Sequence, residues 1–125
     1  MPKLIKIAIA CCAIASAAPA LSADWKTRPT DTMMTADQLT QALSGQTLTY
    51  YDGGTSAFQT DGKYSYTYGN GGTWFGHYVI GDDSTACVTF VTGVSRCDLY
   101  VVSNEKLTVI TEEGQRFPIR SVQAN

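Results

Sequence analysis

The chain has 125 residues, of which 16% are charged, and a formal net charge of −2. This length suits a single domain with a modest core. Because the lysines and arginines form no cluster, the sequence argues against nucleic acid or an anionic membrane surface as a partner.

The N-terminal segment has the composition of an export signal. Two lysines precede an uncharged apolar run over 7–18, and small residues follow near Ala20 and Ala23, as in secretory signal peptides. The run meets Pro19 before it reaches the roughly 20 residues that a membrane-spanning helix needs. We therefore predict a signal peptide over 1–23, cleaved after Ala20 or Ala23, no membrane span, and a mature protein that is periplasmic or secreted.

The next two segments predict an arm and a helix. Residues 24–34 show no periodicity and are expected to form an extended arm. The sequence over 35–38, Thr-Ala-Asp-Gln, is typical of a capping box, and Leu39 and Leu43 share one helical face. We predict a helix over 36–44, too short to be stable unless it packs on the rest of the protein.

The remainder of the chain is typical of short strands separated by turn residues. Hairpin-length connections exclude parallel pairing, which needs long crossovers. Asp61-Gly62 is predicted to form a two-residue type I′ turn, and Pro118 indicates an edge position or a bulge. The predicted strands cover 47–51, 55–60, 63–68, 73–80, 85–91, 94–103, 106–111 and 115–122.

About eight antiparallel strands in this order can close into a barrel or fold into a sandwich. We favour the barrel, because closure leaves no exposed strand edge. The sequence therefore predicts an all-β, mainly antiparallel domain over 35–125, a small up-and-down or lipocalin-like barrel. The short N-terminal helix is expected to plug one end or to pack along the side.

Two cysteines follow the predicted signal, Cys87 and Cys97. An even number in an oxidising compartment favours a disulfide. A three-residue hairpin loop over 91–93, with Gly93 in the left-handed conformation, places the two cysteines at a non-hydrogen-bonded pair. The Cα atoms of such a pair lie about 4.5 Å apart, which a disulfide can bridge. We predict a structural disulfide between them.

Aromatic residues are the best candidates for a binding site. Tyrosine and tryptophan combine a flat apolar face with a polar group, which suits sugar rings and protein interfaces. Since the opposite face of the 63–68 strand is polar, its three tyrosines are expected to point inward and form core, with a tyrosine-walled cavity or rim as the second interpretation. The candidate ligand-binding residues are Tyr64, Tyr66, Tyr68, Trp74 and Tyr78.

No set of residues has the pattern of a catalytic or metal site. His77 is the only histidine, and no serine or carboxylate motif lies near it in the sequence. The carboxylate doublets at 82–83 and 112–113 lie in predicted turns and lack the pattern of a calcium-binding loop. We therefore predict no enzymatic activity, no cofactor and no metal.

Several short motifs are shared with a known group of proteins. They are Gly45-Gln46-Thr47 after the helix, Tyr51-Asp52-Gly53, Gly72-Thr73-Trp74, Cys87, Cys97-Asp98-Leu99-Tyr100 and Glu113-Gly114. With them the chain resembles a family of small exported α-proteobacterial proteins of unknown function. The resemblance implies a periplasmic β-barrel-like fold and no catalytic residues. After Trp74 the chain departs from that family, because Phe75-Gly76-His77-Tyr78 replaces a plainer strand.

Two functions are consistent with these observations. The first is an exported binding module that holds a small ligand or a glycan on its aromatic surface. The alternative is an inhibitor or immunity protein that acts on a cell-wall hydrolase, presenting a loop at 69–72 or 82–83. A binding module should contain a pocket lined by tyrosine or tryptophan, whereas an inhibitor should have a packed interior and a protruding loop.

Overall fold

The computed structural model describes residues 24–125, so the predicted signal peptide lies outside the described residues. This part of the chain contains nine strands and one helix. They are β1 (Asp31–Met33), α1 (Ala36–Leu43), β2 (Gln46–Tyr50), β3 (Thr55–Phe58), β4 (Lys63–Thr67), β5 (Thr73–Ile80), β6 (Thr85–Phe90), β7 (Ser95–Ser103), β8 (Lys106–Ile110) and β9 (Arg116–Ala124).

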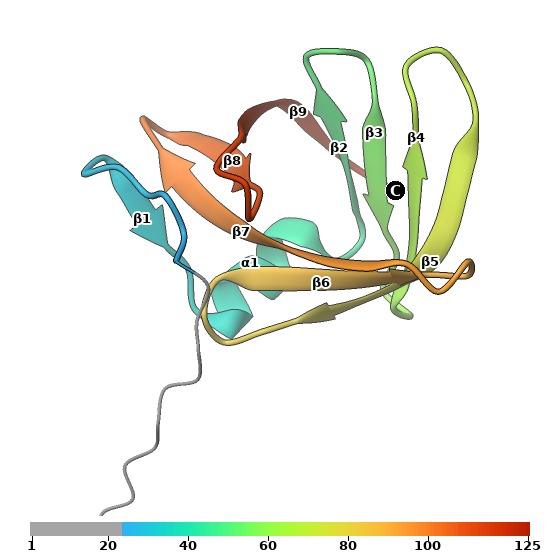
Figure 1. Cartoon of the computed structure of the whole chain (residues 1–125), viewed down its shortest axis with the longest axis horizontal. Helices are drawn as coiled ribbons and strands as arrows, with labels where there is room; N and C mark the ends of the chain where they lie inside the picture. The colour runs from blue at the N-terminus through green and yellow to red at the C-terminus, as the bar shows by residue number, and fades with distance from the viewer. Residues whose placement is uncertain (1–23) are drawn as a thin grey trace, which may run out of the picture.

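Strands β2 to β9 form a closed barrel in which each strand pairs antiparallel with the next along the chain. β9 returns to pair with β2, and this pairing closes the ring (Figure 1). The predicted all-β fold, an up-and-down barrel of eight strands with one short helix, is therefore confirmed. Within residues 24–125 no helix is long and apolar enough to cross a membrane.

Alternation along each strand decides which side chains face the interior. Gly76 of β5 lies at an inward position opposite Tyr64 and Phe90. A Cβ atom at this position would collide with the Thr89 carbonyl oxygen on β6, so the close approach of the two strands requires glycine. The buried core residues on the barrel strands are Leu48, Phe58, Tyr64, Ala86, Val88, Tyr100, Val109 and Ile119.

Helix α1 closes one end of this barrel. The predicted capping box is present: the Gln38 N–H donates to the Thr35 hydroxyl (3.1 Å), and the Thr35 N–H donates to the Gln38 side chain (3.0 Å). Leu39 and Leu43 are fully buried and belong to the same core as the inward-facing strand residues. The helix therefore plugs the barrel end and does not pack along its outer wall.

The arm predicted over 24–34 lies against the outside of the barrel and includes β1. β1 pairs antiparallel with β7. This part of the β7 edge is free because the pairing between β6 and β7 ends at Leu99. Trp25 packs on Leu99, Val101 and Ile110, which form a second buried cluster. The arm thus covers apolar side chains that the barrel wall would otherwise expose to water.

Polar side-chain contacts also attach the arm, among them an ion pair and a buried serine hydroxyl. The Arg116 guanidinium donates two hydrogen bonds to the Asp31 carboxylate, at 2.7 and 2.9 Å, and the Asp31 side chain is only 2% exposed. These hydrogen bonds lower the pKa of Asp31 to about 2. The Met34 N–H donates to the Ser84 hydroxyl (2.8 Å), which donates to the Tyr100 carbonyl oxygen (2.5 Å). Ser84 therefore joins the arm, the β5–β6 turn and β7.

The turn between β3 and β4 differs from the prediction. A type I′ turn needs positive φ at both central residues, but Gly62 has φ +94° and Asp61 is not in the left-handed region. The Gln59 N–H donates to the Lys63 carbonyl, so the loop has three residues, 60–62. The type I′ prediction is wrong because the Asp61 carboxylate accepts a hydrogen bond from the Lys63 N–H (3.0 Å) and stabilises another turn.

Pro118 lies beside a bulge in β9. It pairs with Thr108 of β8, and the pairing of β9 with β2 begins only at the next residue, Ile119. The register then shifts, since Tyr50 pairs with Ile119 and Thr49 with Ser121. A residue without an N–H is tolerated here because β2 requires no hydrogen bond from it.

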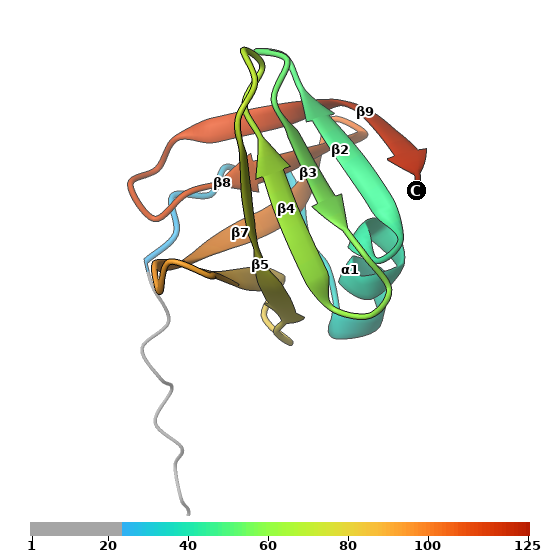
Figure 2. The same ribbon diagram turned by 90° about the vertical axis from the view of Figure 1, so that its right-hand side faces the viewer.

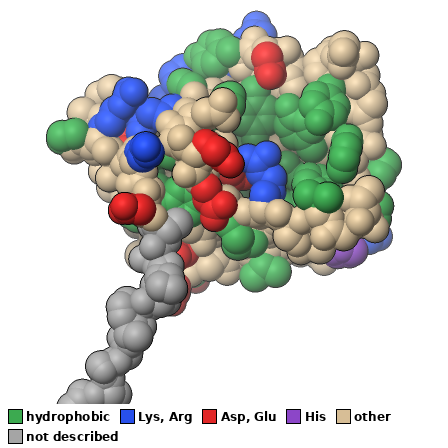
Figure 3. Space-filling view, in the orientation of Figure 1, with side chains coloured by type: hydrophobic (Ala, Val, Ile, Leu, Met, Phe, Trp, Pro, Cys, Tyr) green, Lys and Arg blue, Asp and Glu red, His purple; other side chains and the backbone are tan. Residues whose placement is uncertain are grey.

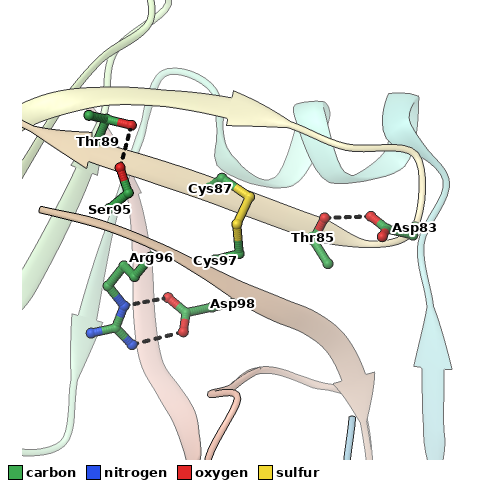
Figure 4. Close-up of a disulfide and its surroundings, with 8 residues drawn as sticks. All are labelled: Asp83, Thr85, Cys87, Thr89, Ser95, Arg96, Cys97 and Asp98. Atoms are coloured by element: carbon green, nitrogen blue, oxygen red, sulfur yellow. Dashed lines mark hydrogen bonds and ion pairs between the residues drawn. A yellow bond between two sulfur atoms is a disulfide. The ribbon is translucent and has the colours of Figure 1, made fainter. Parts of the chain in front are cut away.

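The disulfide is formed as predicted. The Phe90 N–H donates to the Val94 carbonyl (2.8 Å), and Gly93 has φ +94° in a three-residue loop. Cys87 therefore lies opposite Cys97, with the two Cα atoms 4.0 Å apart. Figure 4 shows the bond linking β6 and β7.

Loss of this bond is expected to lower stability measurably. The double variant Cys87→Ser/Cys97→Ser should lose about 2–3 kcal/mol in free energy of unfolding, because the cross-link restricts the unfolded chain. Urea unfolding monitored by circular dichroism measures the change. Reduction of the unmodified protein with dithiothreitol should reproduce it, and a reduced protein as stable as the oxidised one would contradict a structural role.

Candidate functional site

A cavity of about 340 Å³ occupies the end of the barrel opposite α1. In an up-and-down barrel alternate turns lie at the same end, so the β2–β3, β4–β5, β6–β7 and β8–β9 turns surround its mouth. Figure 2 shows the first two of these turns projecting away from α1. The cavity is lined by Tyr50, Asp52, Tyr64, Tyr66, Tyr68, Trp74, Val88, Phe90, Val94, Arg96, Asp98, Tyr100, Val109 and Phe117.

Four of the five candidate binding residues line this cavity, at different depths. Tyr64 is only 8% exposed and belongs to the core, whereas Tyr68 and Trp74 are 48% and 41% exposed. Tyr66 lies between these depths, opposite Trp74 on the neighbouring strand. Both interpretations of the three tyrosines, core and cavity wall, therefore apply. Tyr64, nearer α1, is core, and Tyr68, nearer the mouth, is cavity wall.

Tyr78, the fifth candidate, is not part of the cavity lining. Its hydroxyl donates to the Gln59 carbonyl (2.6 Å) and lies 3.3 Å from the Ser44 hydroxyl. Its ring packs edge-on against Phe58, with the centroids 5.0 Å apart. Ser44 follows α1 directly, so Tyr78 lies at the closed end of the barrel and holds the helix in place.

An ion pair on the cavity wall was not among the candidates. Arg96, Asp98 and Tyr100 alternate on the inner face of β7, and Arg96 lies opposite the inward-facing Val88. The sequence contained a signal for this placement, because the register that pairs Cys87 with Cys97 also pairs Val88 with Arg96. Charged residues in a short strand are more often solvent-exposed.

The geometry of this pair is well defined. Arg96 donates from Nε and Nη2 to the two Asp98 carboxylate oxygens, at 3.0 and 2.8 Å (Figure 4). The Asp98 side chain is 12% exposed and that of Arg96 is 52% exposed. The hydrogen bonds to Asp98 raise the pKa of Arg96, and because there are two of them, from Nε and Nη2, they fix the plane of the guanidinium.

A chain of hydroxyl groups lies next to this pair. The fully buried Ser56 hydroxyl lies 2.8 Å from both the Tyr50 and the Tyr64 hydroxyls. Burial raises the pKa of Tyr64 to about 12, and it also raises the pKa of Tyr50 and of Tyr100 well above the ordinary value. All three phenols are therefore neutral over the physiological pH range and supply polar atoms without charge.

These shifts predict how the protein titrates in alkali. Because the folded-state pKa of Tyr64 lies above its ordinary value of 10.0, its contribution to stability is complete below pH 10 and is lost as the pH rises toward 12. We expect Tyr50, Tyr64 and Tyr100 to remain un-ionised until the barrel opens. Absorbance at 295 nm and circular dichroism, recorded on the same samples, should show their ionisation coinciding with unfolding. Complete tyrosine ionisation in a folded protein would contradict this expectation.

Exposed apolar side chains surround the mouth of the cavity. We define the rim as the exposed aromatic and aliphatic residues on the strands and turns at the open end, namely Tyr51, Tyr68, Trp74, Val91, Val94 and Phe117. In Figure 3 hydrophobic side chains gather over the region of β2, β3 and β4, with a basic side chain at the border of the group. Such a concentration at one end of a small domain is typical of a binding surface.

The remaining candidates for chemistry lie apart from the cavity. His77 is exposed and pairs with Thr89 on the neighbouring strand. Asp82 and Asp83 lie in the β5–β6 turn, at the closed end of the barrel. Within residues 24–125, no three histidine, cysteine, aspartate or glutamate side chains are grouped so that they could hold a metal ion.

Comparison of the chain with protein-family models, curated proteins and solved structures gave no match. The resemblance to a family of exported α-proteobacterial proteins therefore stays a prediction.

Proposed function

We propose that the chain is an exported binding protein that holds a small ligand in the open end of its barrel. The observation that supports this most directly is the aromatic cavity opposite α1, with a volume of about 340 Å³. Small-molecule sites are typically concave and mostly apolar, with a few fixed polar groups. The aromatic walls of this cavity and its ion pair, Arg96 with Asp98, match that composition.

The disulfide and the predicted signal peptide support an oxidising compartment such as the periplasm. The alternative, inhibition of a cell-wall hydrolase, led us to expect a packed interior and a protruding loop. The turn at 69–71 does project from the barrel (Figure 2), but the interior beneath it holds the aromatic cavity and is not packed. The hollow interior favours a ligand-binding protein over an inhibitor.

The proposal predicts that an uncharged aromatic probe enters the cavity. N-phenyl-1-naphthylamine should bind with increased fluorescence, and Trp74→Ala should weaken its binding at least about fivefold by removing an aromatic wall. The matched control is Phe75→Ala on the same strand, because Phe75 is 59% exposed and faces outward. No binding to the unmodified protein, or equal loss in both variants, would refute the proposal.

A further inference from the structure

The polar groups of the cavity indicate which ligand fits, and this inference rests on the proposed function. Arginine has five N–H groups. Two of them are used by Asp98, and the other three donate to no described residue. Since the Arg96 side chain is half exposed and lines the cavity, these donors are available to a ligand. Each Asp98 oxygen retains a lone pair that can accept a hydrogen bond.

The net charge of the ionisable side chains that line the cavity is not positive. Arg96 and Asp98 neutralise each other, and the third ionisable group outside the phenols is Asp52 at the mouth. The Asp52 carboxylate accepts a hydrogen bond from the Gly54 N–H (2.8 Å) and is not paired with a cation among the described residues. An anionic ligand would therefore meet no excess positive charge.

An acyl chain also matches this wall poorly. It would cover Arg96 and Asp98 without offering hydrogen-bond partners, and burial of unsatisfied polar groups is costly. A ligand that fits must offer donors and acceptors at its edge and apolar surface on its faces. Hydroxyl groups meet the first requirement because each can both donate to Asp98 and accept from Arg96.

We propose that the cavity binds a neutral saccharide, with hydroxyl groups of one sugar ring on Arg96 and Asp98 and its faces against the aromatic walls. The rim continues these walls outward through Trp74 and Tyr68, where a second ring can pack. An oligosaccharide end, rather than a free monosaccharide, is therefore the ligand that uses both the cavity and the rim.

Four probes test the proposal on the unmodified protein by isothermal titration calorimetry. They are N,N′-diacetylchitobiose and cellobiose as neutral disaccharides, digalacturonic acid as an anionic one, and dodecanoic acid as an acyl chain. We expect binding of at least one neutral disaccharide, at least about tenfold tighter than the other two classes. Preference for the uronide or the fatty acid would overturn the proposal.

The double variant Arg96→Met/Asp98→Leu removes the ion pair without leaving a buried charge, a change that cores often tolerate. It should lose neutral-disaccharide binding at least about tenfold, and its affinity for N-phenyl-1-naphthylamine should increase because the wall becomes apolar. Arg96→Lys should also weaken disaccharide binding, since lysine lacks the planar fork. Disaccharide affinity unchanged in both variants would refute the role of the pair.

The two proposals fail in different ways. If N-phenyl-1-naphthylamine binds at the cavity but neither neutral disaccharide does, the saccharide inference is wrong and the binding function stands. If no probe binds at the cavity, the binding function itself is wrong. Circular dichroism melting of each variant shows whether the barrel has folded.

Discussion

Replacement of Phe58 with alanine is expected to lower the free energy of unfolding by about 4 kcal/mol, the range observed for large-to-small changes in packed cores. Phe58 is fully buried, and its ring packs against Tyr64 and Tyr78, each with centroids 5.0 Å away. It lies between the helix plug and the cavity lining. Its removal would leave a void that the surrounding strands cannot fill by moving inward.

The measurement is urea unfolding, monitored by circular dichroism. Phe75→Ala is the matched control, since Phe75 is 59% exposed on the outer face of β5 and its loss should change stability by less than about 0.5 kcal/mol. If both variants lose similar free energy, the assignment of inner and outer faces is wrong.

Replacement of Asp31 with alanine should have an effect of comparable size, about 3 kcal/mol, because it leaves the Arg116 guanidinium buried without a partner. The Arg116 side chain is 13% exposed. Lys63→Met is the control, since its ion pair with Asp61 is exposed, with a distance of 3.7 Å, and should contribute less than about 1 kcal/mol. Equal losses in the two variants would contradict a structural role for the arm.

The same ion pair predicts a dependence on acid. The pKa of Asp31 is lowered from 3.8 to about 2 by its hydrogen bonds to Arg116. A depressed folded-state pKa contributes stability that is complete above pH 4 and is lost as the pH falls toward 2, about 2 kcal/mol in total. Urea unfolding at pH 5 and at pH 2 should show this loss in the unmodified protein and a smaller one in Asp31→Ala.

The barrel was predictable because local rules determine most of it. The capping box, the turn glycines and strand alternation are patterns of neighbouring residues, and the loop ending at Gly93 determined the register of Cys87 and Cys97. The attachment of the arm was not predictable, since Asp31 meets Arg116 from 85 residues away in the sequence. Ser84 adopts φ +68°, and only the structure shows that its hydroxyl contacts both Met34 and Tyr100.

The site was predictable in part for the same reason. Strand alternation placed Tyr64, Tyr66 and Tyr68 on one face, and closure of the barrel turned that face inward. Alternation gives no position along the barrel axis, so it could not separate Tyr78 at the closed end from Trp74 at the mouth. The inward position of Arg96 was not predicted because charged strand residues are usually exposed, and only the structure shows its pairing with Asp98.

The most direct test of the account is the position of bound ligand, because the central claim is that the end opposite α1 is the binding site. The chain has two tryptophans, Trp74 at the cavity and Trp25 in the outer cluster. In ¹H–¹⁵N correlation spectra, titration with N-phenyl-1-naphthylamine and with a neutral disaccharide should shift the Trp74 indole resonance and the Arg96 Nε resonance. The Trp25 indole resonance should stay in place. Shifts confined to Trp25 or to α1, with Trp74 unchanged, would contradict the account.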